Sequence, residues 1–80
     1  MRMDKYLKVS RLIKRRTVAN EACDAGRVSV GGKPVRASYE VKIGDEITVA
    51  LGARTLKVRV TALDEHANKD AAATLYTVID

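Results

Sequence analysis

The chain lacks phenylalanine and tryptophan, and three tyrosines are its only aromatic residues. We therefore do not expect a surface that binds single-stranded nucleic acid by stacking bases on aromatic rings. Cysteine and histidine each occur once, as Cys23 and His66, so neither an intramolecular disulfide nor a zinc site can form within the chain. The apolar surroundings of Cys23 in the sequence predict a small core residue rather than a redox group.

Long apolar runs and the motifs of catalysis are missing as well. No segment approaches membrane-spanning length, and the start of the chain lacks a secretion signal, so we expect a cytoplasmic protein without a membrane partner. The sequence contains no Gly-rich phosphate loop, nucleophile elbow or metal-ligand spacing. We therefore predict that the protein is not an enzyme and needs no cofactor or metal.

Positive charge is plentiful and lies mostly in the first half. The chain has a net charge of +5. Residues 1–36 contain ten basic and three acidic residues, a net charge of +7, whereas residues 37–80 have five basic and seven acidic residues. A one-sided positive field favours a polyanionic partner through steering and counterion release. The plainer interpretation is a solvated charged helix face, and we favour an RNA-binding surface over it.

Helical periodicity covers the first third of the chain. We expect Asp4 to cap a helix over 5–9 and a second helix to cover about 15–25. Gly26 would end this second helix, because glycine readily adopts the left-handed closing conformation. Four residues recur at helical spacing and are predicted to form its buried stripe: Val18, Ala19, Ala22 and Cys23.

Beyond Gly26 the pattern changes to alternation, which is typical of strands. We predict strands near 27–30, 34–36, 46–51, 55–62 and 74–79, with Gly31-Gly32 as a tight turn. Residues 64–73 are expected to form a loop or a short frayed helix. Eighty residues allow one domain over 1–80, with a core motif in about 1–50 and a sheet-completing part in about 51–80. The predicted fold class is α+β, with two N-terminal helices packed on a small, mainly antiparallel sheet.

The basic residues of the first half are the candidate RNA-binding site. Arginine suits this role because its planar guanidinium meets two phosphate oxygens at once, so recognition should depend on RNA shape. Asp4 is expected to cap a helix or orient an arginine, and Asp64-Glu65-His66 to be solvated surface. Tyr6 could equally stack on a base or pack in the core. Lys33 and Arg36 of the hairpin are expected to extend the contact. Several of the following residues are predicted to line one groove between the two helices: Arg2, Lys5, Lys8, Arg11, Lys14, Arg15 and Arg16.

Residues 1 to about 50 contain a set of short motifs: Arg2-Met3-Asp4-Lys5, Arg15-Arg16 before an Ala-rich helix, Gly26-Arg27-Val28, Gly32-Lys33-Pro34-Val35, Ser38, Val41 and Gly44-Asp45-Glu46-Ile47. Together these motifs resemble the S-four RNA-binding domain, a module named after a small-subunit ribosomal protein. Gly31 departs from the family pattern, which more often has Asn there, although both residues support the same turn.

Residues 1–17, the overall length and residues 75–79 resemble more closely a branch of this family that acts in ribosome-associated quality control. This resemblance implies a monomer that binds large-subunit rRNA and peptidyl-tRNA on a stalled, split large ribosomal subunit. It also implies support of RqcH, which adds a C-terminal alanine tail to the stalled chain. RNA contacts are implied at Arg2 and Arg16, with Lys5, Lys8 and Arg15 as neighbours.

Three other functions are alternatives to this one. The heat-shock S-four protein recycles stranded peptidyl-tRNA without tailing, but usually carries a longer basic C-terminal extension. S-four domains also occur as appendages of pseudouridine synthases and tyrosyl-tRNA synthetases; Met1 directly before the motif and a self-contained last strand favour a complete protein. A DNA-binding helix-turn-helix is less favoured, because the junction lacks a recognition helix with base-reading side chains.

Overall fold

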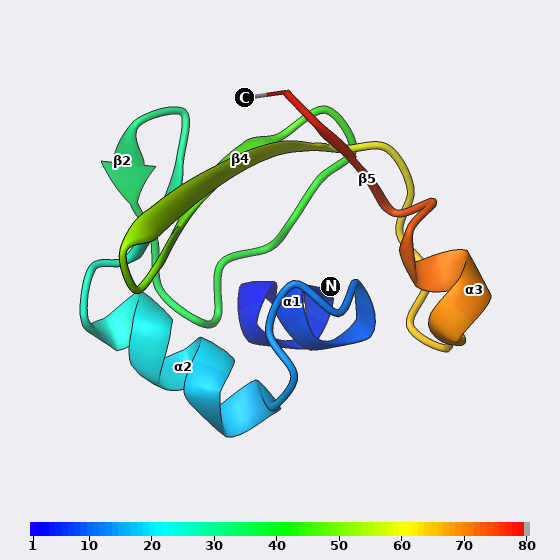
Figure 1. Cartoon of the computed structure of the whole chain (residues 1–80), viewed down its shortest axis with the longest axis horizontal. Helices are drawn as coiled ribbons and strands as arrows, with labels where there is room; N and C mark the ends of the chain where they lie inside the picture. Colours follow the sequence, from blue (N-terminus) through cyan, green and yellow to red (C-terminus); the bar gives the residue numbers. More distant parts are fainter. Residues whose placement is uncertain (80) are drawn as a thin grey trace.

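A computed structural model describes residues 1–79 and contains two N-terminal helices, a five-stranded sheet and a short third helix. Figure 1 shows the sheet curving over α1, with α2 to one side of this helix and α3 to the other. The elements are α1 (Met3–Val9), α2 (Arg16–Asp24), β1 (Val28–Val30), β2 (Lys33–Pro34), β3 (Glu46–Leu51), β4 (Arg54–Val60), α3 (Lys69–Ala72) and β5 (Tyr76–Val78).

The sheet has the strand order β2-β1-β3-β4-β5, and every neighbouring pair is antiparallel. Its register aligns apolar residues across the strands, because Val28 lies opposite Val49 and Ile47 lies opposite Val58. Since alternate residues of a strand point to one face, these rows form the inner face of the sheet. All four side chains are fully buried. The predicted α+β fold is confirmed.

Helix α1 supplies the largest side chains of the core. Met3, Tyr6 and Leu7 are fully buried, and Ser10 at the end of the helix is buried beside them. The Tyr6 hydroxyl donates a hydrogen bond to the backbone carbonyl of Leu75, at 2.7 Å. Tyr6 is therefore a core residue, and the alternative of base stacking is wrong. This bond joins the first helix to the segment that leads into the last strand.

Small residues let α2 pack closely on α1 and β1. Ala19, Ala22 and Cys23 are buried, as predicted. The burial of Cys23 confirms its predicted place in the core, and it raises the pKa of the thiol to about 11. Val18 was predicted to join this stripe, but 45% of its surface is exposed. One side of α2 alone meets the protein, and Val18 lies at the edge of that side.

The turns and the last segment follow the sequence pattern closely. Gly26, Gly31 and Gly32 have positive φ angles of 75°, 59° and 86°, so the predicted helix stop and tight hairpin turn are both confirmed. Residues 69–72 form the expected short helix, whose cap is the Asn68 side chain accepting from the Ala71 backbone N–H at 2.8 Å. Strand β4 ends at Val60, two residues before the predicted limit.

The beginning of α1 differs from the prediction. The helix begins at Met3 with Arg2 at the N-cap position, and Asp4 lies in its first turn. No side chain caps this end of the helix. Asp4 is instead buried, and its carboxylate contacts the side chains of Arg2 at the N-cap and of Arg16 and Asn20 on α2. The capping role is therefore wrong, and the alternative role of orienting arginines is the one observed.

Candidate nucleic-acid interface

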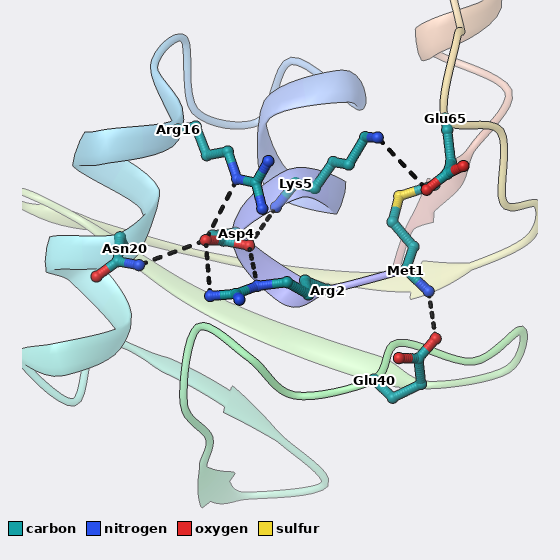
Figure 2. A network of polar contacts seen from close by, with 8 residues as sticks. All are labelled: Met1, Arg2, Asp4, Lys5, Arg16, Asn20, Glu40 and Glu65. Atoms are coloured by element: carbon teal, nitrogen blue, oxygen red, sulfur yellow. Dashed lines mark hydrogen bonds and ion pairs between the residues drawn. The ribbon is translucent and has the colours of Figure 1, made fainter.

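The first residues of the chain are held by the segment that precedes β3. Arg2 forms an isolated antiparallel bridge with Glu40. The Met3 backbone N–H donates to the Tyr39 carbonyl at 2.8 Å, and the Val41 N–H donates to the Met1 carbonyl at 2.9 Å. The terminal ammonium of Met1 also bonds the Glu40 carboxylate (Figure 2). The backbone at Arg2 is thus fixed on the body of the protein.

Asp4 lies at the centre of a polar network between α1 and α2 (Figure 2). Its carboxylate accepts from the Arg2 Nε at 3.2 Å and from the Asn20 Nδ2 at 3.3 Å, and pairs with the Arg16 Nε at 3.3 Å. The Arg2 Nη2 also donates to it at 3.4 Å, and the Lys5 backbone N–H donates at 2.8 Å. The Asp4 side chain is only 3% exposed, whereas those of Arg2 and Arg16 are 49% and 48% exposed.

These contacts keep Asp4 ionised. Burial raises the pKa of its carboxyl group, but the hydrogen bonds from Arg16, Asn20 and Arg2 lower it by more. The net result is a pKa below the ordinary value, so the carboxylate stays charged throughout the neutral range. Two guanidiniums facing one carboxylate leave an excess positive charge and several free N–H donors at the surface.

The network fixes the direction of two arginines before any ligand arrives. An exposed arginine loses side-chain entropy when it binds, and a side chain that is already oriented loses less. Arg2 and Arg16, which are far apart in the sequence, share one carboxylate and one surface. Their outward N–H groups suit bidentate contact with phosphate oxygens. Contact of these two residues with RNA stays a prediction.

The other basic side chains of the N-terminal half divide between separate places. Lys5 turns to Glu65, with 3.4 Å between its Nζ and Oε1 (Figure 2). Lys8, Arg11 and Lys14 line a groove whose opposite wall is residues 65–67. A second, smaller depression lies between the helices, at Asp4, Arg16, Thr17, Asn20 and Glu21. Of the seven basic residues, Arg16 alone lines the depression between the helices, and three others line the first groove.

Three other predicted site residues, like Arg2 and Lys5, line neither depression. Arg15 is exposed at the N-cap position of α2. Lys33 is exposed in the edge strand β2, and Arg36 is exposed in the loop that follows. The structure supports their accessibility, and their contact with RNA stays a prediction.

Two contributions were not predicted from the sequence. Asn20 holds Asp4, and the available signal was its position four residues after Arg16, which puts both on one face of α2. Glu65 and His66 are exposed, as predicted, but they also form a wall of the groove. No sequence signal links them to α1, because the contact depends on how the chain returns after β4.

Residues 1–79 contain neither a candidate membrane span nor a cluster of metal ligands. None of the helices described is long and apolar enough to cross a membrane. Within the same residues, no three His, Cys, Asp or Glu side chains come together as metal ligands would.

Comparison with known proteins assigns the chain to a family. The S4 (S-four) domain family matches residues 1–47. The RQC P-site tRNA stabilizing factor of Bacillus subtilis is 51% identical over 79 residues, which are 99% of this chain and 92% of the relative. The factor of the same name from Listeria monocytogenes is 47% identical over 79 residues, covering 99% of this chain and 86% of the relative.

The fold has a close counterpart among solved structures. The trimeric structure of Vibrio cholerae heat shock protein 15 superposes with a TM-score of 0.92 at 26% sequence identity. The superposition covers 99% of this chain and 81% of that protein. The motifs that carry the S-four resemblance, the two-helix and sheet architecture and these relatives agree, and the chain belongs to the S4 domain family and, within it, to the RQC P-site tRNA stabilizing factors (RqcP).

Proposed function

We propose that this protein is a non-catalytic factor of ribosome-associated quality control that binds RNA through its N-terminal helices. It would hold large-subunit rRNA and peptidyl-tRNA on a stalled, split large ribosomal subunit in the cytoplasm, and so support alanine tailing by RqcH. The observation that carries the proposal is the pair of half-exposed arginines, Arg2 and Arg16, fixed by the buried Asp4 carboxylate. The names of the relatives, and their identity over nearly the whole chain, support the assignment to this pathway.

The charge distribution supports binding to a polyanion. The excess of positive charge lies on the half that contains the arginine pair, and the remaining half is slightly acidic. Phosphate contacts made by such a surface release counterions, so affinity should fall steeply with salt. A protein that makes about 6 phosphate contacts loses roughly a thousandfold in affinity between low and physiological salt.

The decisive experiment is cosedimentation with large subunits that carry peptidyl-tRNA. Arg2→Ala or Arg16→Ala should each weaken binding by about tenfold or more, because a charge-assisted hydrogen bond contributes roughly 1.5–3 kcal/mol. Thermal melting of each variant checks that the fold survives. Lys57→Ala and Arg59→Ala, both on β4 in the acidic half, are the matched controls and should bind like the wild type.

The reverse pattern would overturn the proposal. If the β4 variants lose binding while Arg2→Ala and Arg16→Ala retain it, the binding face lies on the sheet and the family carry-over is wrong for this chain. A flat response to salt would remove the electrostatic argument independently of any variant.

A second function is favoured by the close structural likeness to heat shock protein 15. In this alternative the protein recycles stranded peptidyl-tRNA on free large subunits and tailing is not involved. The two functions separate in a reconstituted tailing reaction with RqcH. Omission of the protein should abolish alanine addition under the first function and leave it unchanged under the second.

A further inference from the structure

The C-terminal end of α1 and the loop after β4 enclose a basic groove that lies partly outside the residues matched by the S4 family. Its volume is about 670 Å³. Lys8, Arg11 and Lys14 form one wall, and residues 65–67 form the other. The family match ends at residue 47, so the second wall is a feature that the family motif does not contain.

The groove has an excess of positive charge. All three cations of the first wall are exposed and have no carboxylate partner within ion-pair distance among residues 1–79. The acidic residue of the opposite wall, Glu65, is paired with Lys5 at 3.4 Å. His66 adds a ring N–H that can donate to an anion. The groove is thus a place where an anion meets donors from two sides.

The backbone at Arg11 gives a second reason to expect a ligand. Arg11 has φ of 62°, and it is the one non-glycine residue with a positive φ in the described chain. The left-handed conformation is strained for a residue with a Cβ, and glycine would relieve that strain at this helix end. Strained residues of this kind concentrate at binding sites, where the side chain has a use that offsets its cost.

The shape and lining of the groove favour a nucleic-acid backbone over a small nucleotide. The only aromatic ring among the described residues that line it is the small imidazole of His66, and no Tyr side chain is there for a base to stack on. Lys8 follows Asp4 by one helical turn on α1, which places the groove beside the arginine pair along the same helix. An RNA strand that passes over Arg2 and Arg16 can continue into the groove.

The geometry points to this groove as a second phosphate-binding site, which takes the phosphodiester backbone of an RNA segment next to the one held by Arg2 and Arg16. The inference rests on the proposed RNA-binding function and extends it to residues 65–67. Two contact areas on one small protein let it hold two RNA segments, or two turns of one RNA, in a fixed relation.

The test measures binding of a fluorescent RNA hairpin to the full chain by anisotropy, over a range of salt. His66→Glu places a negative charge in the loop wall and should weaken binding by about tenfold, with a shallower salt dependence. Ala53→Glu, in the exposed turn between β3 and β4, changes the net charge equally and should have little effect. Arg11→Gly should weaken binding while leaving the melting temperature unchanged or raising it, because the backbone strain is relieved.

Each other outcome contradicts a defined part of the inference. If Arg2→Ala loses binding while His66→Glu and Arg11→Gly bind like the wild type, the groove is not an RNA site, although the proposed function stands. If none of these variants changes binding, the proposed function itself fails. Adenosine monophosphate, inorganic phosphate and polyglutamate are added as competitors. Competition by any of them at concentrations far below those that screen charge would assign the groove to small anions or acidic peptides instead.

Discussion

The helical half and the sheet half of the protein each hold arginine with a carboxylate, but in different surroundings. In the sheet, the Arg59 Nη2 lies 3.0 Å from the Glu46 Oε2, and the two side chains are 51% and 41% exposed. Between the helices, Arg2 and Arg16 lie 3.2 and 3.3 Å from a carboxylate that is 3% exposed. The shorter distance is that of Arg59 and Glu46, an exposed pair whose contact water can replace. Burial of the carboxylate, not the distance, separates a fixed arginine from a solvated one.

The difference matters for function because a partner must compete with the existing contacts. A surface ion pair contributes roughly 0–1 kcal/mol, since water and salt screen it. An arginine held only by such a pair keeps most of its rotamers and binds phosphate at an entropic cost. The arginines on Asp4 have part of that cost removed by folding. The helical half is therefore prepared for an anion in a way that the sheet half is not.

Removal of the two carboxylates should give the largest contrast. Asp4→Ala leaves the Asn20 amide and two guanidiniums without their partner, so the free energy of unfolding should fall by about 1–3 kcal/mol. Glu46→Ala should cost less than about 1 kcal/mol. Urea denaturation measures both. Equal losses would show that burial of Asp4 does not distinguish the two regions.

The same pair of variants sharpens the comparison through RNA affinity. Each variant raises the net charge by one unit, so nonspecific attraction to RNA increases equally in both. Asp4→Ala should nevertheless bind RNA more weakly than the wild type, because Arg2 and Arg16 lose their orientation. Glu46→Ala should bind at least as well as the wild type. Tighter binding by both variants would mean that charge alone governs affinity.

A single hydroxyl in the helical half should have a smaller effect. Tyr6→Phe removes the bond to the Leu75 carbonyl, and the expected loss in the free energy of unfolding is about 0.5–1.5 kcal/mol. RNA affinity should stay unchanged, because the phenol is buried and away from the exposed arginines. A loss of affinity in a variant of unchanged stability would contradict the assignment of Tyr6 to the core.

Acid pH should remove the contribution that the ionised Asp4 carboxylate makes to the stability of the fold. The pKa of Asp4 is lowered in the folded protein, so its contribution to stability is present above its ordinary pKa of 3.8 and is lost as pH falls below that value. Asp4→Asn should be less stable than the wild type at pH 7, and the difference should narrow towards pH 3. Thermal melting across this range measures it. A constant difference would show that the charge of Asp4 is irrelevant.

The smallest expected effect concerns the reactivity of a thiol. Burial raises the pKa of Cys23 to about 11, so little thiolate is present at neutral pH and iodoacetamide should react slowly with the folded chain. A thiol placed on the exposed strand β4 by Thr55→Cys, in a Cys23→Ala background, should react at the rate of a free thiol. Similar rates would mean that the helical core opens readily.

The local sequence pattern was sufficient to predict the helices and strands, but it was insufficient to predict the arrangement of the candidate site. The strand over 46–51 was predicted with its observed bounds, and α2 to within one residue, because alternation, helical period and glycines act over a few neighbours. The sequence left two roles for Asp4, helix cap or partner of an arginine, because the choice depends on how α2 folds back on α1. The groove could not be predicted, since four of the five strands separate its two walls in the sequence.

The bond between Tyr6 and Leu75 spans 69 residues, and it gives the folding of the chain an order in time during synthesis. The helices leave the ribosome first, whereas the partner of Tyr6 and the strand β5 that follows it emerge only after the other four strands. The packing that positions α1 is therefore complete only when Leu75 has emerged.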